Sequence, residues 1–507
     1  MRNQINIIGS GFAGISAAAH LASKGYSVDV FEKNEGPGGR ASVFESNGFK
    51  FDMGPSWYWM PGVFEQFFNH FGSKVSDHYN LLRLDPGYRI YFGKDDIVDI
   101  PASMSELRDL FESLEPGSAK KLDKFLAEAE YKYEKGINDL VHKPSRSIFE
   151  FADVTLLKDL FRLQLFSSIR NHVHSMFKND KIRKILEFPV YFLGALPENT
   201  PALYSLMNYA DLSLGTWYPQ GGMHEIIKGM VRVAEQQGAR FHYNSAVDSI
   251  PVSNGIVNGL MVNNELKQSN VVVAGADYHH VDQYLLEKPY RNYDEKYWDK
   301  RVMAPSSLIF YMGIDKKLEG LEHHNLFFDK SFEIFAREIY SSPQWPTDPL
   351  FYVSCTSKTD PSVAPEGQEN MFILVPVAPG LEDTDEVREQ LYDLVMDRLE
   401  SLTGQKIKEH VIYRRSFAHR DFKERYHAFK GNAYGLANTL FQTAIFKPSL
   451  TNKNLKNLFY TGQLTVPGPG VPPSIISGEV VSKEIEKDFP LNSQGASTKK
   501  DKYESVI

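Results

Sequence analysis

Three glycines near the beginning of the sequence have the spacing of a phosphate-binding loop. Gly9, Gly11 and Gly14 form the pattern G-x-G-x-x-G between an apolar run at residues 4–8 and a helical run at residues 15–23. In such a loop the first glycine permits a tight turn, the second lets the backbone approach a pyrophosphate, and the third lets the helix pack closely against the strand. The N–H groups at the start of the helix then face the phosphates. The chemistry that these residues predict is the binding of a dinucleotide.

A carboxylate at the end of the second predicted strand supports the same interpretation. Residues 27–31 have the pattern of a strand, which leads into Glu32, 18 positions after Gly14. At this place a carboxylate accepts hydrogen bonds from the ribose hydroxyls of a dinucleotide. Nicotinamide enzymes and flavin enzymes share these features, so the segment beyond Glu32 has to distinguish between them.

The residues after Glu32 contain a Gly-Gly-Arg segment. Residues 31–40 read FEKNEGPGGR and residues 48–55 read GFKFDMGP. Together with the glycine loop, these motifs resemble those of FAD-dependent amine oxidases and carotenoid desaturases. The resemblance implies that Gly38 and Gly39 pass close to FAD and that Arg40 lies near its phosphates and isoalloxazine ring.

The ordered set of motifs along the chain makes the resemblance more specific. GTWYPQGGM begins at residue 215, PSVAPEGQENMFILVPVAP at residue 361 and NLFYTGQLTVPGPGVPPSIISG at residue 457. With the N-terminal motifs, they resemble those of bacterial phytoene desaturases from residue 5 to about residue 485. The resemblance implies FAD as the cofactor, bound by Gly9, Gly11, Phe12, Ala13, Gly14, Glu32, Lys33, Gly38, Gly39, Arg40, Gly54, Pro55, Ser56, Val247, Gly462, Gln463, Gly470, Val471 and Pro472.

The predicted fold class is α/β. It combines a Rossmann-like FAD-binding domain, similar to that of glutathione reductase and the amine oxidases, with a discontinuous α+β substrate domain and a helical part that associates with a membrane. Apolar strands at residues 270–276 and 457–460 are expected to return to the FAD-binding domain late in the chain. The predicted boundaries are 1–75, 212–280 and 440–488 for the FAD-binding domain, 76–211 and 281–439 for the substrate-binding and membrane-associating region, and 489–507 for a disordered tail.

Two further segments are expected beside the flavin. Pro472 and Pro473 suit the first turn of a helix, where a missing N–H group is harmless. By resemblance, the N-terminus of this helix points at the pyrimidine edge of the flavin and favours negative charge on the reduced ring by about 0.3–1 kcal/mol. The backbone at Gly221 and Gly222 is also expected to contact the cofactor.

The segments between the cofactor motifs are rich in aliphatic and aromatic residues. Residues 187–211 are dense in both, and residues 156–177 place leucine and phenylalanine at helical spacing, with Lys158, Arg162 and Arg170 among them. Such a helix either packs on a core or lies in a membrane interface, where its basic residues meet anionic lipid. A hydrocarbon substrate would favour the membrane.

The resemblance implies a C40 hydrocarbon substrate such as phytoene. Moving it into water would cost on the order of 30 kcal/mol, so we expect the enzyme to take it from a bilayer. By resemblance, a hydride passes from a substrate carbon to the flavin while a proton leaves the neighbouring carbon. The intervening carbocation is allylic, so the protein mainly positions carbon against flavin. Glu150, Asp211 and Asp421 are the candidate proton acceptors.

The histidines and the cysteine predict no other chemistry. The histidine pairs lack the i, i+4 spacing that directs two ligands from one helix face to a metal, so no metal site is expected. These pairs are His172 and His174, His279 and His280, and His323 and His324. The single cysteine, Cys355, has no catalytic motif around it, rules out an internal disulfide and fits a reducing compartment.

Composition limits the partners of the chain. The formal net charge is −8 and no basic block dominates, which argues against a nucleic-acid partner. No stretch reaches the roughly 18–20 apolar residues of a spanning helix, and no signal peptide is recognised. We therefore expect a peripheral protein on the cytoplasmic side of a membrane, with a C40 carotenoid from the bilayer and an electron acceptor, oxygen or quinone, as partners.

Three alternatives share parts of this pattern. A flavin amine oxidase usually places an aromatic pair by the flavin, whereas the C-terminal motif here has Pro467, Gly468 and Pro469. A non-catalytic binder of prenylated proteins has the same architecture, but the intact glycine loop and Arg40 count against it. Residues 56–68 differ from the smaller residues of the most familiar desaturases, so a carotenoid isomerase or a desaturase of hydroxylated carotenoids stays open.

Overall fold

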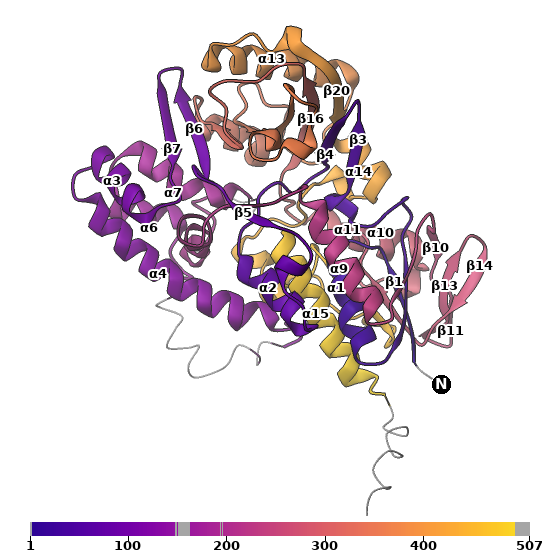
Figure 1. Ribbon diagram of the computed structural model, residues 1–507. Coiled ribbons are helices and arrows are strands. Elements are labelled where there is room, and N and C mark those ends of the chain that lie inside the picture. The colour runs from indigo at the N-terminus through magenta and orange to yellow at the C-terminus, as the bar shows by residue number, and fades with distance from the viewer. Residues whose placement is uncertain (1–2, 148–149, 151–162, 193, 195, 492–507) are drawn as a thin grey trace, which may run out of the picture.

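The computed structural model describes residues 3–147, 150, 163–192, 194 and 196–491. The chain forms a mixed α/β structure in which a parallel sheet lies below a second, larger sheet, and a group of helices lies to one side (Figure 1). Among the described residues, no helix has both the length and the apolar composition that crossing a membrane requires.

The parallel sheet has five strands in the order β21–β15–β1–β2–β9. Ile5 and Ile7 of β1 pack into one apolar cluster, and Ile8 packs into another on the opposite face. Both faces are buried, as the continuous apolar runs predict for parallel strands. The predicted strands at residues 4–8 and 27–31 are confirmed, and those at 270–276 and 457–460 are shorter than predicted. The strands are β1 (Gln4–Ile8), β2 (Ser27–Phe31), β9 (Arg240–His242), β15 (Val271–Ala274) and β21 (Leu458–Tyr460).

Helices α1 (Phe12–Ser23), α9 (His224–Gln236) and α15 (Val471–Asp488) cover one face of this sheet. Close contact depends on glycine, because a Cβ added to Gly14 would lie 2.0 Å from the carbonyl oxygen of Gly9. A Cβ added to Gly478 of α15 would lie 2.5 Å from the carbonyl oxygen of Ala13 in α1. Such distances leave no room for a side chain, so both positions require glycine.

The second sheet has seven strands in the order β20–β16–β19–β18–β17–β6–β7. Neighbouring strands are antiparallel except β17 and β6, which are parallel. Helix α13 (Asp385–Thr403) packs on its outer face (Figure 1), and the opposite face turns toward the parallel sheet. The strands are β6 (Tyr88–Gly93), β7 (Asp96–Ile100), β16 (Ser306–Ile314), β17 (His324–Phe327), β18 (Phe351–Ser354), β19 (Glu369–Val377) and β20 (Val411–Phe417).

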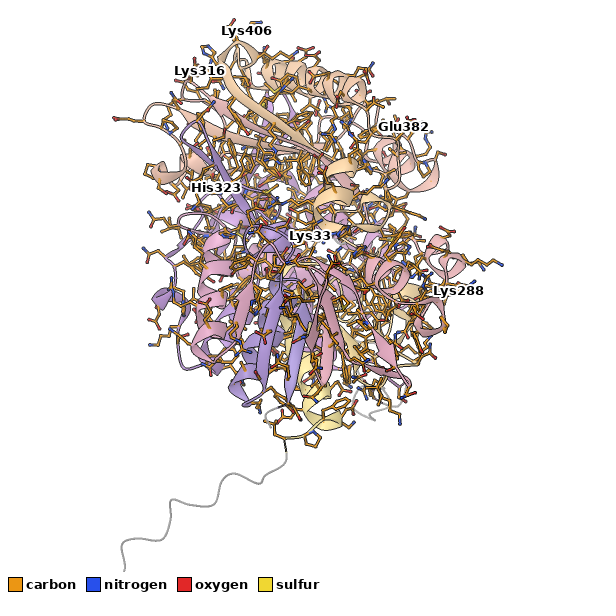
Figure 2. The ribbon with its side chains drawn as sticks, turned by 90° about the vertical axis from the view of Figure 1, so that its right-hand side faces the viewer. Lys33, Lys288, Lys316, His323, Glu382 and Lys406 are labelled. Atoms are coloured by element: carbon orange, nitrogen blue, oxygen red, sulfur yellow. The ribbon has the colours of Figure 1, made fainter. Side chains whose placement is uncertain are left out.

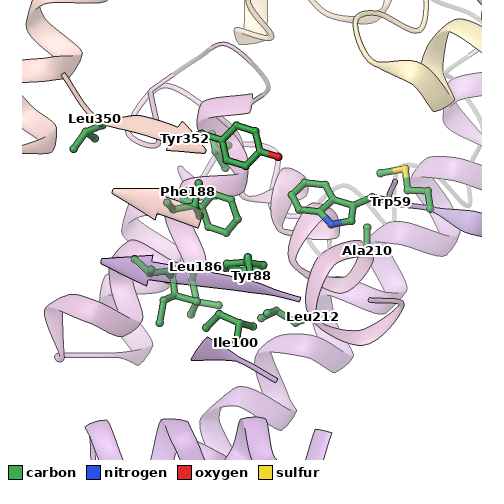
Figure 3. Packing of buried hydrophobic residues seen from close by; sticks show 14 of the residues in the cluster. Trp59, Tyr88, Ile100, Leu186, Phe188, Ala210, Leu212, Leu350 and Tyr352 are labelled. Carbon is green, nitrogen blue, oxygen red and sulfur yellow. The ribbon is translucent and has the colours of Figure 1, made fainter. Parts of the chain in front are cut away.

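The helices at the side are α3 (Met104–Leu114), α4 (Ser118–Asn138), α6 (Ile169–Met176) and α7 (Asp180–Phe192). Their apolar faces join the inner face of the second sheet in one large apolar cluster (Figure 3). The amphipathic helix predicted at residues 156–177 falls partly on residues 156–162, which lie outside the described residues. Residues 163–167 form turns, and the helix that follows begins only at Ile169, after the N-cap Ser168. The prediction of one continuous helix is therefore wrong at residues 163–168, and residues 169–176 are helical as predicted.

A carboxyl group lies inside this apolar cluster. Asp211, one of the predicted proton acceptors, is buried and accepts hydrogen bonds from the Tyr88 hydroxyl at 2.8 Å and the Thr216 hydroxyl at 3.4 Å. The indole N–H of Trp59 donates to the same Thr216 oxygen at 2.9 Å. Burial raises the pKa of Asp211 to about 7, because a charged carboxylate is unfavourable in an apolar surrounding.

We predict that Gly14→Ala lowers the free energy of unfolding by about 3 kcal/mol, because its Cβ would overlap the Gly9 carbonyl and force the helix away from the sheet. The thermal midpoint of the cofactor-free protein measures this change. Gly11→Ala is the matched control, since a Cβ there meets no atom within 4 Å. Equal midpoints for the two variants would contradict the close contact.

A second prediction concerns Asp211. Between about pH 4 and pH 7 the folded protein keeps a proton on Asp211 that the unfolded chain releases, so this group lowers stability as the pH rises through that window. The loss above pH 7 amounts to at most about 4 kcal/mol. In Asp211→Asn the amide stays neutral, so the thermal midpoint should fall less between pH 5 and pH 8 than in the wild type. Parallel pH profiles for the two proteins would rule out this protonated state.

Candidate cofactor and substrate cavity

A cavity of about 410 Å³ opens where the parallel strands end below the second sheet. Lys33, which directly follows β2 and Glu32, lies at this junction in Figure 2. The carboxyl ends of parallel strands are where such folds bind ligands. Of the residues predicted to bind FAD, Gly14 packs behind the wall, and the others line the cavity: Gly9, Gly11, Phe12, Ala13, Glu32, Lys33, Gly38, Gly39, Arg40, Gly54, Pro55, Ser56, Val247, Gly462, Gln463, Gly470, Val471 and Pro472.

The glycine loop presents backbone rather than side chains to the cavity. Gly9 has a φ of +91°, and its amide donates to the carbonyl oxygen of Phe31 at 2.8 Å. Gly11 is the N-cap of α1, and a Cβ built on it would meet no atom within 4 Å. The space over this backbone is free for a phosphate, which the N–H groups of a helix N-terminus bind.

Glu32 organises the end of β2. Its Oε2 accepts hydrogen bonds from the amide and the hydroxyl of Ser10, both at 2.9 Å. Its Oε1 accepts from the amide of Asn34 at 3.0 Å and from the side-chain amide of Asn34 at 2.8 Å. The carboxylate therefore ties the glycine loop to the loop after β2, in the position that a ribose would reach.

Two cations near the cavity have few hydrogen-bond partners. The Nη2 of Arg40 donates to the Asn432 carbonyl at 3.4 Å, its Nε has no hydrogen-bond partner, and its guanidinium lies 5.3 Å from the Tyr426 ring centre. Lys447 is buried; its Nζ donates to Asn438 Oδ1 at 3.2 Å, and burial lowers its pKa to about 8. Since a buried donor without an acceptor is costly, the Nε of Arg40 fits an electron-rich or phosphate-bearing ligand. No motif in the sequence marks Lys447 as part of this site.

The C-terminal motif closes the cavity at the start of α15. Gly470 is the N-cap of this helix, with Pro472 and Pro473 in its first turn, as predicted. The hydroxyl of Ser477 accepts a hydrogen bond from the amide of Gly462 at 2.9 Å, which fixes the turn after β21 against the helix. The helix N-terminus faces the cavity and favours negative charge there.

The other end of the cavity is apolar and aromatic. Trp57 stacks on the imidazole of His324 with ring centres 4.2 Å apart and planes inclined by 10°. The lining side chains with a formal charge are Glu32, Lys33, Arg40, Asp277 and Arg425, which come from the strand ends of the parallel sheet and the segments packed on them. The apolar end is lined by Trp57, Trp59, Met60, Met207, Ile309, Tyr352, Leu374, Ala433 and Tyr434.

The three predicted proton acceptors do not line this cavity. Glu150 accepts hydrogen bonds from the backbone amides of residues 145–147. Asp421 forms an ion pair with Arg388 at 2.7 Å and accepts from the amide of Ala418. Asp211 reaches the lining through partners: Thr216 links it to Trp59, and Tyr88 links it to Trp57. Each of these carboxyl groups has a local structural partner.

Gly221 and Gly222, which the sequence analysis expected beside the cofactor, do not line the cavity. The Gly221 amide donates to Asp360 at 2.6 Å instead. A Cβ on Gly222 would lie 2.7 Å from a carboxylate oxygen of Asp52, which binds the two following amides. The glycines let this loop close around two carboxylates.

No cluster of three or more metal-binding side chains occurs within the part of the chain that the structure describes. Cys355 is buried, and burial raises the pKa of its thiol, which disfavours the nucleophilic thiolate. In the sequence His324 stands out only through its adjacent partner His323, at a spacing that does not suit a metal site. No sequence signal marks Tyr352, which approaches His324 from the neighbouring strand.

Comparisons with known proteins cover almost the whole chain. The family described as flavin containing amine oxidoreductase matches residues 12–485. A carotenoid 3,4-desaturase of Haloarcula japonica is 39% identical over 96% of this chain and 98% of its own. A zeta-carotene-forming phytoene desaturase of Myxococcus xanthus is 30% identical over 95% of this chain and 93% of its own.

Solved structures share the fold of this chain. A crystal structure of an oxidoreductase from Methanosarcina mazei superposes with a TM-score of 0.63, at 16% identity, over 95% of this chain and all of the other. The free backbone at Gly11 and the unpaired Nε of Arg40 fit the phosphate-bearing cofactor of these enzymes. The chain is therefore an FAD-dependent oxidoreductase and belongs to the flavin-containing amine oxidoreductase family, with carotenoid desaturases among its relatives.

Proposed function

We propose that this protein desaturates a carotenoid, converting phytoene through successive steps to lycopene or a related polyene. One observation carries the proposal: the cavity that contains the glycine loop and Glu32 continues to an end lined by Trp57, Trp59 and Met60 without charged side chains. A nucleotide and a hydrocarbon can therefore meet in one site. The names of the relatives from Haloarcula and Myxococcus support a carotenoid as the substrate.

We assign the cofactor to the lining residues in a fixed order. Glu32 and Val247 would hold the adenosine end, and the backbone at Gly9 and Gly11 would hold the pyrophosphate. Arg40 and the N-terminus of α15 would lie beside the flavin ring, where positive potential stabilises the charge that reduction leaves there. Lys33 donates to the Glu424 carbonyl at 2.6 Å and so keeps α14 (His419–Tyr426) over this end of the cavity.

Bound FAD supplies the acceptor for a hydride from a saturated carbon, and oxygen or a quinone would reoxidise it. The aromatic and aliphatic side chains exclude water and align the polyene against the cofactor. Alignment is the main requirement, because the developing positive charge is allylic and is spread over the existing double bonds.

Delivery from a membrane follows from the chemistry of the substrate. Three phenylalanine side chains among the described residues are strongly exposed: Phe166 at 82%, Phe441 at 73% and Phe446 at 50%. The rings of Phe441 and Phe446 lie 6.2 Å apart. Exposed aromatic side chains of this kind suit a membrane interface, so we propose a peripheral protein on the cytoplasmic side of a bilayer.

A second candidate is supported by the name of the Haloarcula relative, carotenoid 3,4-desaturase. In that case the substrate is already a conjugated carotenoid, and the enzyme introduces one further double bond near its end. The same cavity serves both reactions, since each places an apolar chain against the flavin. The two candidates differ in whether phytoene or a coloured carotenoid is consumed.

We predict that Glu32→Gln weakens FAD binding at least tenfold. The substitution replaces one acceptor oxygen with an amide N–H₂ group, which repels the donors of Ser10 or Asn34. It also removes the charged acceptor for the ribose hydroxyls. We expect the binding free energy of FAD to weaken by about 1.5–3 kcal/mol. Titration of the cofactor-free protein with FAD, followed by flavin fluorescence, measures the dissociation constant. Glu35→Gln is the control, because Glu35 is exposed and pairs with Arg425. Equal affinities in the two variants would argue against a ribose contact.

The proposed function is tested with the FAD-loaded protein and three substrates: phytoene in liposomes, lycopene in liposomes and putrescine in buffer. Each new conjugated double bond shifts the absorption band to longer wavelength, so we expect coloured products from phytoene. Putrescine should produce no hydrogen peroxide.

The three arms separate the candidates. Lycopene consumed while phytoene stays unchanged would replace the first candidate with the second. Peroxide from putrescine alone would identify an amine oxidase. Both carotenoids unchanged, under conditions in which light reduces the bound FAD, would overturn carotenoid desaturation.

A further inference from the structure

Two polar side chains meet at the apolar end of the cavity. Tyr352 on β18 lines the cavity, and His324 lies behind it on the neighbouring antiparallel strand β17. The Tyr352 hydroxyl lies 2.6 Å from His324 Nδ1. Figure 3 shows the hydroxyl oxygen of Tyr352 on the side of the cluster where Trp59 lies.

In the tautomer that is protonated at Nε2, His324 can accept this hydrogen bond from the Tyr352 hydroxyl. Burial lowers the pKa of His324 well below its usual value, so the ring is neutral. Burial raises the pKa of Tyr352, so its hydroxyl keeps its proton and can donate it to Nδ1. In this arrangement His324 Nε2 carries the ring proton and has no hydrogen-bond partner. An unsatisfied buried N–H group costs about 1–3 kcal/mol, which calls for a functional explanation.

The other hydroxyl groups of the lining lack a comparable base. Tyr278 donates to the Ser449 carbonyl at 3.0 Å and accepts from Asn292. Tyr426 and Tyr434 also line the cavity, and in the described structure neither hydroxyl is hydrogen-bonded to an imidazole or a carboxylate. Glu150, Asp211 and Asp421 stand outside the lining.

We propose that Tyr352 is the catalytic residue that accepts the proton of desaturation and passes its own proton to His324. The proposal rests on the proposed function and names the proton acceptor for it. One C–H bond breaks with transfer of its electron pair and hydrogen, as a hydride, to FAD. The neighbouring C–H bond then breaks, its electron pair forms the new C=C bond, and its proton goes to the Tyr352 oxygen.

The charge balance explains why two neutral groups suffice. As the Tyr352 oxygen receives the substrate proton, its own proton moves to His324 Nδ1, and the imidazole becomes an imidazolium. The positive charge thus moves from the allylic cation to the imidazole. Trp57 lies flat against this ring, with centres 4.2 Å apart, so its π face stabilises the cation that forms.

The test compares Tyr352→Phe with Tyr340→Phe in the FAD-loaded protein. Both variants remove one hydroxyl from the same apolar cluster, but Tyr340 does not line the cavity and its hydroxyl has no hydrogen-bond partner in the described structure. We expect Tyr352→Phe to lower kcat by about 10²–10⁴-fold with KM for phytoene changed less than about threefold. Tyr340→Phe should change kcat less than about threefold. FAD content and thermal midpoint confirm that each variant is folded.

His324→Asn adds a readout that a purely structural role would not move. Its amide oxygen can still accept the Tyr352 hydroxyl near the position of Nδ1 but cannot take the proton. Proton loss should therefore become rate-limiting, and deuterium at the carbon that loses the proton should slow both this variant and Tyr352→Phe more than the wild type.

The outcomes separate this inference from the proposed function. Equal kcat values for Tyr352→Phe and Tyr340→Phe, in a wild type that desaturates phytoene, would overturn the inference alone. Deuterium isotope effects in Tyr352→Phe and His324→Asn that equal that of the wild type would also overturn the inference alone. A wild type that desaturates no carotenoid would overturn the proposed function, and this inference with it.

Discussion

Close backbone contact between α1 and the end of β1, and between α15 and α1, is the constraint on which the cavity depends. Gly14 of α1 touches the Gly9 carbonyl, and Gly478 of α15 touches the Ala13 carbonyl of α1, so α1 lies nearer to the loop after β1, and α15 nearer to α1, than side chains would allow. The hydroxyl of Ser16 adds a hydrogen bond to Ile475, 459 residues away in the sequence. These contacts bring the start of α1 and the start of α15 to the same place. The nucleotide end of the cavity is thus formed by backbone from both ends of the chain.

Desolvation then divides the cavity into two chemical environments. At the strand ends, Glu32 keeps four hydrogen bonds and Arg40 keeps an unpaired Nε, so this end suits a polar, phosphate-bearing ligand. At the other end, the same loss of water makes charge unfavourable. In the apolar cluster around this end, outside the lining itself, burial raises the pKa of Asp211 to about 7 and keeps His324 neutral. A hydrocarbon fits the apolar end, because beside charged side chains it would displace their hydrating water at a high cost in free energy.

The sequence predicts the parts of the site whose signals are local. Glycines at fixed spacing, a strand followed by a carboxylate, and two prolines after a glycine each specify a short piece of backbone, and the structure brings these pieces to one cavity. The proton acceptors were harder to predict, because the sequence around a carboxylate such as Glu150 or Asp421 does not show whether the side chain binds backbone amides or faces a substrate. Tyr352 and His324 meet through strand pairing in the second sheet, and Arg40 meets Tyr426 across the cavity. Contacts of this kind can be identified only when the register of the strands and the position of α14 are known.

A neutral proton acceptor is consistent with the rest of the apolar end. The carbocation next to a polyene is a strong acid, so the position of the acceptor matters more than its basicity. A carboxylate at this end would need hydration or a cation beside it, and either would compete with the hydrocarbon for space. A phenol backed by an imidazole avoids this conflict, because both groups are uncharged until the proton arrives. The resulting charge then forms against the face of Trp57, one ring away from the substrate. The same burial that excludes water from the polyene therefore keeps the proton acceptor neutral until it receives the substrate proton.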